Sequence, residues 1–461
     1  MCTRQVHVRN GGAEVQIQLS GSRCIISETW GGRQFCAESD RIKNAWNCKM
    51  DSSCEGSERL QWVRLRKKQE TPTRAQPCPL PTKRRKERMN RYMEKQQVGY
   101  WELEGTYREI GKQLAGQPGA KPVYSPAPKK FTQEDLQEAL RLYDRYCPGI
   151  REELEGYAQE AGIAVQDIAY TWMTYLLPGC SGLILTGKKT DDGHTKIARN
   201  YEFTLEEEDL KLYRTAPAGK YAHISGSIAE FGRTEGINEK GLAVSMSSCG
   251  FPVSNMPGMR APALKGLQFW AVIRSLLENC ADAKEALERA MEMPIAYNIN
   301  LYLADGGGTG ILFETMEGEK AYACIGPQGG NQYLCGTNHI VLESLVAREP
   351  AAMENSIVRR DKLAAFAEKK ACLTEKEIRE FMLKKYPEGM TVPYYKEGFG
   401  TIKTVILDTA EKRYSICWLG QETNGWTDYR VSEKRGNHTE EKEVQRETPN
   451  PEFFACKPLP A

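Results

Sequence analysis

The order of strand-like and helix-like segments after residue 180 is the feature that most constrains the fold. Ten short apolar runs, many separated by turns that contain Gly or Asp, have the composition of β-strands. Their ranges are 181–187, 195–203, 221–229, 242–248, 297–304, 310–315, 320–325, 332–337, 402–408 and 413–419. Two helical stretches interrupt them, at 264–292 and 354–387, and these divide near residues 281–282 and 373–374 respectively. This order predicts an α+β fold in which two packed antiparallel sheets carry helices on their outer faces.

The segment before residue 180 is predicted to be mainly helical. A short strand at 101–106 precedes a helix that begins after Thr106, with Glu109 completing a capping box. A Pro-rich loop at 118–130 leads to a helix capped by Thr132, and a third helix at about 150–161 ends at Gly162.

These patterns predict four parts of the chain. Residues 1–88 lack sustained periodicity and include a Lys/Arg/Pro/Gln-rich stretch, so we expect a disordered upstream extension, with Met89 or Met93 as the real start. Residues 89–179 form the helical segment, and 180–435 form the principal domain. We expect the polar tail at 436–461 to be poorly ordered.

Composition excludes several classes of function. The net charge of +2 among 461 residues indicates no preference for nucleic acid or an anionic membrane. No run approaches the roughly 18 apolar residues of a membrane helix, and no secretory signal is evident, so we expect a cytoplasmic protein. The chain has only five His, and its 15 Cys include no C-x2-C pair, so neither a metal nor a cofactor is expected.

Cys180 is the strongest candidate for a nucleophile, because it follows a Pro-Gly turn and begins a strand-like run. Gly179 before it tolerates unusual backbone angles. The Cys180 thiol could attack the Gly179 carbonyl, and hydrolysis of the resulting thioester would free Cys180 as a new N-terminus. The new α-amine, with a reference pKa near 8, would serve as both base and acid, so this chemistry requires no histidine.

Several motifs, in order along the chain, resemble the choloylglycine hydrolase and penicillin V acylase group of N-terminal-nucleophile (Ntn) hydrolases. They are Gly179–Gly182, Ala198–Phe203, Asn238–Leu242, Cys335–His339 and Ser356–Arg360. The chain most resembles the autoproteolytic acyl-coenzyme A:6-aminopenicillanate acyltransferase (peptidase C45) family, over residues 100 to 419. The resemblance implies a four-layer αββα sandwich and self-cleavage between Gly179 and Cys180. It also implies a small-molecule amide or acyl donor as substrate and the cleaved pro-segment as a small subunit, and it leaves a homo-oligomer open.

The resemblance also implies roles for residues near Cys180. Cys180 matches the family nucleophile, and Arg199 matches an arginine that would lie near the thiolate and lower its pKa. Glu202 stands where the family usually has Asp, a residue that contacts the new α-amine. Glu keeps the charge but reaches one methylene further.

Two later motifs complete the implied site. Asn338 matches an asparagine whose amide donates to the tetrahedral oxyanion, and Ser247 or Ser248 falls where the family has a backbone oxyanion donor. Arg359, in preference to Arg360, matches a second active-site arginine. The Asn238–Leu242 hairpin is interpreted as structural.

Three alternatives remain open from the sequence. Cys180 could act in an uncut chain with His339 as base, although a packing role for His339 is favoured. The chain could also be a silent homologue used for binding, which only the exchange of Asp for Glu at position 202 supports. The sequence does not distinguish hydrolase from transferase activity. It assigns the walls of the substrate pocket only to loops near 204–220, 249–264 and 387–401. Candidate pocket residues are Tyr201, Phe251, Trp270, Tyr394, Tyr395 and Phe399.

Overall fold

The computed structural model describes residues 4–10, 13–20, 23–30, 33–38, 93–117, 132–168, 170, 179–250, 262–349 and 351–459. For residues 4–38, Met93, Gly179 and Cys180 it describes the backbone alone. The chain divides into two compact units, Met1–Pro79 and Leu80–Ala461. The Pro-rich loop predicted at 118–130, the candidate start Met89 and the predicted pocket residue Phe251 lie outside the described residues.

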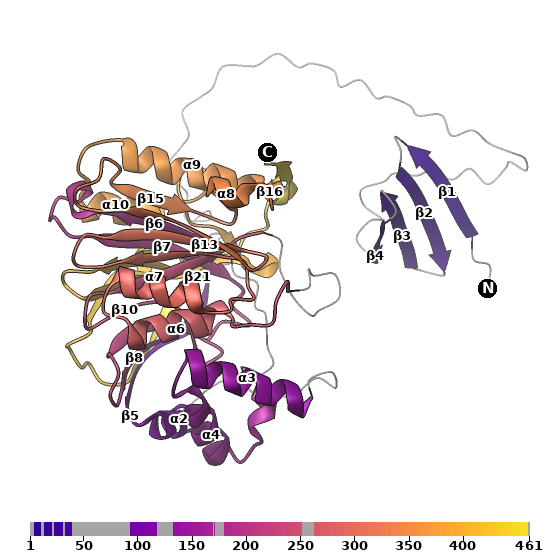
Figure 1. The fold of residues 1–461 in the computed structure, drawn as a ribbon. Helices are drawn as coiled ribbons and strands as arrows, with labels where there is room; N and C mark the ends of the chain where they lie inside the picture. Colours follow the sequence, from indigo (N-terminus) through magenta and orange to yellow (C-terminus); the bar gives the residue numbers. More distant parts are fainter. Residues whose placement is uncertain are drawn as a thin grey trace, which may run out of the picture. The chain divides into compact units, whose positions relative to one another are not determined.

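The first unit contains a four-stranded antiparallel sheet in the order β1-β2-β3-β4 (Figure 1). Its strands are β1 (Arg4–Asn10), β2 (Ala13–Ser20), β3 (Arg23–Trp30) and β4 (Arg33–Glu38). The expectation of an unstructured extension is therefore wrong for this stretch. Short runs that alternate apolar and polar residues, separated by Gly-containing dipeptides, are the pattern of successive β-hairpins.

The second unit is built on two large sheets. The nine-stranded sheet has the order β14-β13-β12-β11-β10-β9-β8-β5-β21, and all its pairs are antiparallel except β5 with β8. Its strands are β5 (Met93–Gly105), β8 (Lys211–Pro217), β9 (His223–Ile228), β10 (Gly232–Asn238), β11 (Ala243–Ser248), β12 (Ile299–Ala304), β13 (Gly310–Met316), β14 (Glu319–Ile325) and β21 (His438–Gln445).

The seven-stranded sheet has the order β15-β6-β7-β18-β19-β20, and β17 also pairs with β18. Its strands are β6 (Gly179–Leu185), β7 (Lys196–Phe203), β15 (Tyr333–Gly336), β17 (Pro393–Tyr394), β18 (Phe399–Asp408), β19 (Arg413–Trp418) and β20 (Thr427–Arg430). β6 and β7 pack face to face on β11 and β12 of the larger sheet.

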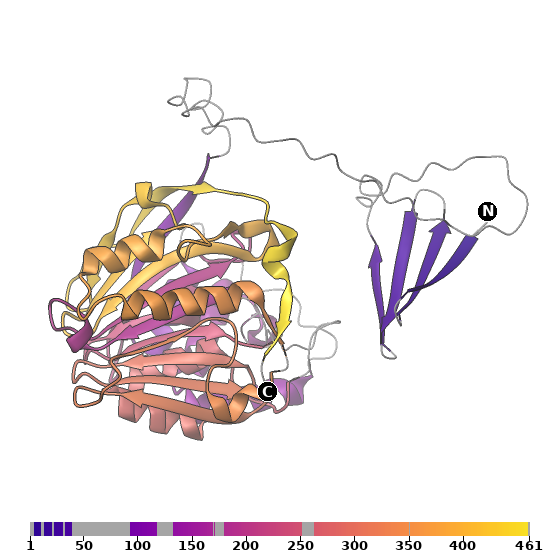
Figure 2. The ribbon, with the colours of Figure 1, turned by 90° about the horizontal axis from the view of Figure 1, so that it is seen from above.

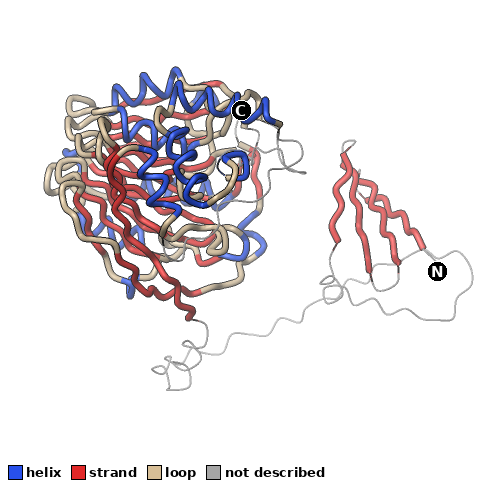
Figure 3. Tube along the Cα trace, turned by 90° about the horizontal axis from the view of Figure 1, so that it is seen from below, coloured by secondary structure: helices blue, strands red, loops and turns tan. Residues whose placement is uncertain are grey.

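Helices cover the outer face of each sheet, as the sequence predicted. α6 (Phe269–Asn279) and α7 (Ala283–Glu292) pack on β10 to β13, whereas α9 (Glu354–Glu368) and α10 (Glu375–Leu383) pack on the seven-stranded sheet. Figures 2 and 3 show the strands of this unit between the helices. The predicted αββα sandwich is confirmed, and both helical stretches divide where the sequence indicated. A short helix, α8 (Glu343–Val346), lies between β15 and α9.

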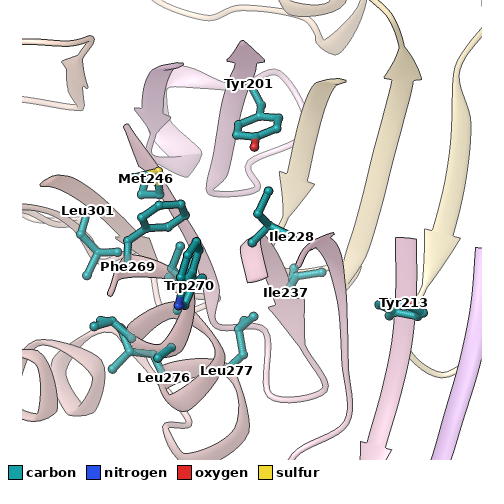
Figure 4. Packing of buried hydrophobic residues seen from close by; sticks show 14 of the residues in the cluster. Tyr201, Tyr213, Ile228, Ile237, Met246, Phe269, Trp270, Leu276, Leu277 and Leu301 are labelled. Atoms are coloured by element: carbon teal, nitrogen blue, oxygen red, sulfur yellow. The ribbon is translucent and has the colours of Figure 1, made fainter. Parts of the chain in front are cut away.

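The core beneath α6 comes from the regular spacing of its apolar residues. Trp270 and Leu277 are buried and face Ile228 of β9 and Ile237 of β10 (Figure 4). These side chains belong to one large hydrophobic cluster that also includes Tyr201 of the seven-stranded sheet.

Residues 93–168 are part of the sandwich. β5 lies inside the nine-stranded sheet between β8 and β21, and it is longer than the short strand predicted. Three helices follow: α2 (Tyr107–Ala115), α3 (Gln133–Tyr146) and α4 (Ile150–Ala161). The predicted capping box of Thr106 with Glu109 is present, as is the predicted helix end at Gly162, which has φ of 68°.

A buried ion-pair network joins these helices to α6. Arg274 of α6 donates to both carboxyl oxygens of Glu153 on α4, at 2.8 and 2.5 Å, and to Glu278 at 2.8 Å. The Tyr107 hydroxyl of α2 donates to the other oxygen of Glu278 at 2.8 Å. Removing one partner from such a network leaves a buried charge uncompensated.

The expectation of a poorly ordered C-terminal tail is wrong. β21 pairs along its whole length with β5 at the edge of the nine-stranded sheet. Phe453 is buried against Val392 and Phe399, and β22 (Cys456–Pro458) pairs with β16 (Ala351–Met353). The charged side chains of β21 are exposed or partly exposed on an edge strand, where they suit solvent, while the buried Val444 anchors it. Polarity therefore reflected an edge position and not disorder.

Candidate active site

The pairing of β6 with its neighbours defines the candidate site. Antiparallel register places Gly179 opposite Glu202, Cys180 opposite Tyr201 and Gly182 opposite Arg199. On the other side of β7, Glu202 pairs with Thr401 of β18. The backbone of Cys180 thus lies beside the strand that carries two predicted site residues.

Glu202 is fully buried, and neither of its carboxyl oxygens accepts a hydrogen bond of ordinary geometry from the described residues. Burial raises its pKa to about 8, although Arg359, Arg199 and the nearby Thr401 hydroxyl oppose this effect. The Glu202 carboxyl is therefore mainly neutral at pH 7 in the uncut chain, and a cation placed beside it would favour its ionised form.

Arg199 is buried between the two sheets, where its charge is already compensated. Its guanidinium lies 2.5 Å from Glu235 of β10 and donates to the Thr234 carbonyl. It also stacks over the ring of Tyr201, with 4.9 Å between the guanidinium carbon and the ring centre. Lys403 of β18 lies 4.7 Å from the same ring centre and 3.2 Å from Glu235.

Asn338 and Arg359 lie in direct contact, although 21 positions separate them in the sequence. Arg359 donates to the Asn338 side-chain oxygen at 2.6 Å and to Asn355 at 2.9 Å. The Asn338 side-chain amide donates to the Ser248 carbonyl at 2.9 Å. Because Arg359 holds the amide oxygen, the Asn338 NH₂ group points away from the guanidinium and can donate. The preference for Arg359 agrees with its burial, since Arg360 is partly exposed.

His339 lies in a hydrogen-bonded setting that suits a packing role. Its Nδ1 lies 2.8 Å from the Ser356 hydroxyl and 3.2 Å from the Thr337 hydroxyl. Burial, and then the positive charges of Arg360 and Arg359, lower its pKa to about 4. Such a ring is neutral and weakly basic, so it is poorly suited to activating a thiol at neutral pH.

The Asn238 hairpin is structural, as the sequence analysis proposed. The Asn238 side chain donates to the carbonyls of Leu277 and Cys280, and it accepts hydrogen bonds from the backbone of Lys240 and Leu242. Ser247 likewise donates to the Thr337 carbonyl and has no solvent exposure.

One group of potential metal ligands occurs among the described residues, but its chemistry does not suit a metal. Asp192, His194 and Asp408 lie close together. The Lys196 ammonium lies 2.8 Å from Asp192 and also contacts Asp408, and Arg413 lies 3.3 Å from Asp408. Protein cations already occupy the position that a metal ion would take.

The aromatic residues predicted for an acyl pocket mostly pack within the core. Phe399 and Tyr394 contact Phe453 edge to face, with ring centres 5.2 and 4.9 Å apart. Tyr395 is buried, and its hydroxyl donates to the Thr401 carbonyl at 2.7 Å. Tyr395 and Thr401 also line a pocket of about 210 Å³.

Sequence reasoning missed the buried charges that surround the predicted residues. Glu235, Glu208 and Lys403 are fully buried between the sheets, and burial raises the pKa of Glu208 to about 7 although the Lys403 charge opposes this effect. Charged residues on strands can be noticed in a sequence, but their partners lie on distant strands, so no local pattern pairs them.

This αββα chain is an enzyme that acts on amides by hydrolysis or acyl transfer, as comparison with a family model shows. A family model for acyl-coenzyme A:6-aminopenicillanic acid acyl-transferase matches residues 188–423, just over half of the chain. The chain therefore belongs to this family, as its motifs indicated.

Comparison with solved structures finds similar chains at low identity. Penicillin V acylase from Agrobacterium tumefaciens is 18% identical, with 58% of this chain and 91% of that chain covered and a TM-score of 0.36. A mutant conjugated bile acid hydrolase from Clostridium perfringens is 13% identical, with 58% and 97% covered and a TM-score of 0.36. No curated protein matches the chain. Among the described residues, no helix has the length and apolar character needed to cross a membrane.

Proposed function

We propose that this protein is a self-processing cysteine amidase or acyltransferase that acts on linear, non-peptide amides through a thioester on Cys180. The observation that carries the proposal is Glu202, a buried acid that pairs in register with Gly179 and has no ordinary hydrogen-bond donor among the described residues. Cleavage between residues 179 and 180 would create an amine beside this acid. That amine would supply a positive charge and a hydrogen-bond donor to Glu202.

Maturation then proceeds in two balanced steps. The Cys180 sulfur bonds to the Gly179 carbonyl carbon, the bond from that carbon to the Cys180 nitrogen breaks, and the thiol proton passes to the nitrogen. The peptide bond thus becomes a thioester with a free amine. Water attacks the thioester, and the products are a Gly179 carboxylate and a free Cys180 thiol.

In the catalytic cycle the α-amine of Cys180 takes the thiol proton and later returns it to the leaving amine of the substrate. Asn338, oriented by Arg359, donates to the oxyanion of the tetrahedral intermediate. Water releases the acyl group in the hydrolase reaction, and a bound amine accepts it in the transferase reaction. Arg199 is proposed to contribute positive charge to this region, although its contact with Glu235 reduces that contribution.

The segment before Cys180 is proposed to remain bound as a small subunit after cleavage. β5 is hydrogen-bonded on both sides within the nine-stranded sheet, and Arg274 joins α4 to α6. Release of this segment would expose two strand edges and a buried arginine, and both changes are unfavourable.

Intact-mass measurement tests the cleavage. The wild-type protein should give two chains, the larger beginning at Cys180, whereas Cys180→Ala should remain one chain. A wild-type protein that stays uncut under all conditions contradicts self-processing.

A second experiment tests the amidase activity. Released amine is measured across a panel of acyl amides, and hydroxylamine is added to trap the thioester as a hydroxamate. A cut protein that releases no amine and forms no hydroxamate would support the alternative of a silent homologue.

A further inference from the structure

We propose that Glu314, with its cross-strand neighbour Asn300, positions Asn338 for catalysis by holding the backbone of residues 337–342, which we call the Asn338 loop. This inference rests on the proposed role of Asn338 as oxyanion donor. Glu314 is a positioning residue, because it contacts the loop backbone and not the Asn338 side chain.

The two residues are directly opposite each other on adjacent strands. Asn300 of β12 pairs with Glu314 of β13, so their side chains emerge side by side on one face of the sheet. The Asn300 amide donates to the carbonyls of Thr337 and His339, both at 3.0 Å. Glu314 accepts hydrogen bonds from the backbone N–H groups of Val341, at 3.0 Å, and Leu342, at 2.9 Å.

The chemistry of each side chain matches the part of the loop that it contacts. Asn300 supplies a donor to two carbonyls on either side of Asn338, and Glu314 supplies an acceptor to two N–H groups further along. The Ile340 N–H group lies between these two parts of the loop, and it donates a hydrogen bond to Glu349. Three consecutive N–H groups therefore donate to two buried carboxyl groups, which is unusual for a loop outside regular secondary structure.

Fixing the backbone on both sides of Asn338 leaves its side chain little freedom. The Asn338 N–H itself donates to the Ser356 hydroxyl of α9 at 2.7 Å, and Arg359 from the same helix holds the side-chain oxygen. The loop is thus attached to the nine-stranded sheet by Glu314 and Asn300, and to the helix of the opposite layer by Ser356 and Arg359. An oxyanion donor requires such rigidity, because its contribution depends on placement before the reaction.

A carboxylate is a costly choice for this purpose, which favours a functional reason. Glu314 has no solvent exposure, and burial raises its pKa to about 7 although the Leu342 and Val341 N–H groups oppose the rise. Hydrogen bonds to a charged acceptor are roughly twice as strong as neutral ones. Above pH 7, where it is ionised, Glu314 therefore holds the loop more firmly than a neutral side chain would.

Glu314→Gln tests the inference. Glutamine keeps the shape, but its NH₂ group must face one of the two backbone N–H groups, so one hydrogen bond is lost. We expect roughly tenfold faster hydrogen exchange for the amides of residues 340–342, measured at pH 8 by mass spectrometry. With an N-acyl p-nitroanilide as probe, kcat should fall roughly tenfold, less than the loss from removing an oxyanion donor, while KM stays unchanged. The matched control is Glu319→Gln, an exposed glutamate on the adjacent strand β14, which should change neither quantity.

The two readouts separate this inference from the proposed function. Unchanged kcat in a folded Glu314→Gln enzyme overturns the inference, and so does an equal effect on kcat and KM. If Glu314→Gln does not fold, Glu349→Gln takes its place, with the same expected results for Ile340. If the wild-type protein cleaves no amide, the proposed function is wrong. Unchanged hydrogen exchange at residues 340–342 in Glu314→Gln would then overturn the attachment of the loop as well.

Discussion

Replacing Glu202 with glutamine should remove a specific pH dependence of stability from the uncut chain. The pKa of Glu202 rises from 4.5 to about 8 on folding, chiefly because the carboxyl is buried. Between these two values the folded chain holds a proton that the unfolded chain has lost. The contribution of Glu202 to stability is therefore greatest below pH 4.5 and is lost as the pH rises toward 8.

The size of this effect follows from the width of that pH window. Each pH unit within it is worth about 1.4 kcal/mol, so the free energy of unfolding should fall by about 3 kcal/mol between pH 5.5 and 7.5 on account of Glu202 alone. The Glu202→Gln variant has no ionisable group there and should lack this part of the decrease. Glu208 and Glu314, whose pKa values burial also raises to about 7, affect both proteins alike and cancel in the comparison.

Urea unfolding of Cys180→Ala, with and without Glu202→Gln, measures the effect at the two pH values. The Cys180→Ala background excludes the proposed cleavage, so that no new amine can form near Glu202. The control is Glu207→Gln, an exposed carboxylate five positions along, which should leave the pH dependence intact. Equal pH dependence with and without Glu202→Gln would refute the argument that this acid is buried and neutral.

Three further predictions concern the site and its support. Arg359→Lys cannot hold Asn338 and Asn355 together, so kcat should fall roughly 10- to 100-fold in an amide assay; an unchanged kcat would contradict the role given to Arg359. Arg274→Met leaves buried Glu153 unpaired and should destabilise the uncut protein by about 3–5 kcal/mol in urea unfolding; a cost below about 1 kcal/mol would show that the network is dispensable. His339→Gln should retain kcat within about threefold, because a ring with a pKa near 4 is a weak base; a loss of several orders of magnitude, without a new N-terminus at Cys180, would favour the Cys-His alternative.

Much of the fold was predictable because it depends on local patterns. Apolar runs and turns identified most central strands, and the predicted capping signals at Thr106 and Thr132 coincide with helix starts. Strands β8 and β10 were missed, since the polar residues that occupy them resemble loops. Glu235 of β10 is buried there because its partner Arg199 lies on the other sheet.

The site was predictable only in part for the same reason. Ordered motifs identified Arg199, Glu202, Asn338 and Arg359 as candidates, but no pattern indicated that Arg199 lies against Glu235. Nor could the sequence indicate that Glu202 is without an ordinary donor, because this depends on the strands and helices that exclude water around it.

The sequence by itself determined the class of fold, the family and the bond proposed for cleavage, because these depend on the order of local motifs. Only the tertiary structure decided which charges are compensated and which are not. Arg199 meets a carboxylate, Glu202 has no hydrogen-bond donor of ordinary geometry among the described residues, and Glu314 holds the loop of Asn338. The physical reason is that a charge between two packed sheets is governed by its nearest partners, and the register and stacking of distant strands bring those partners together.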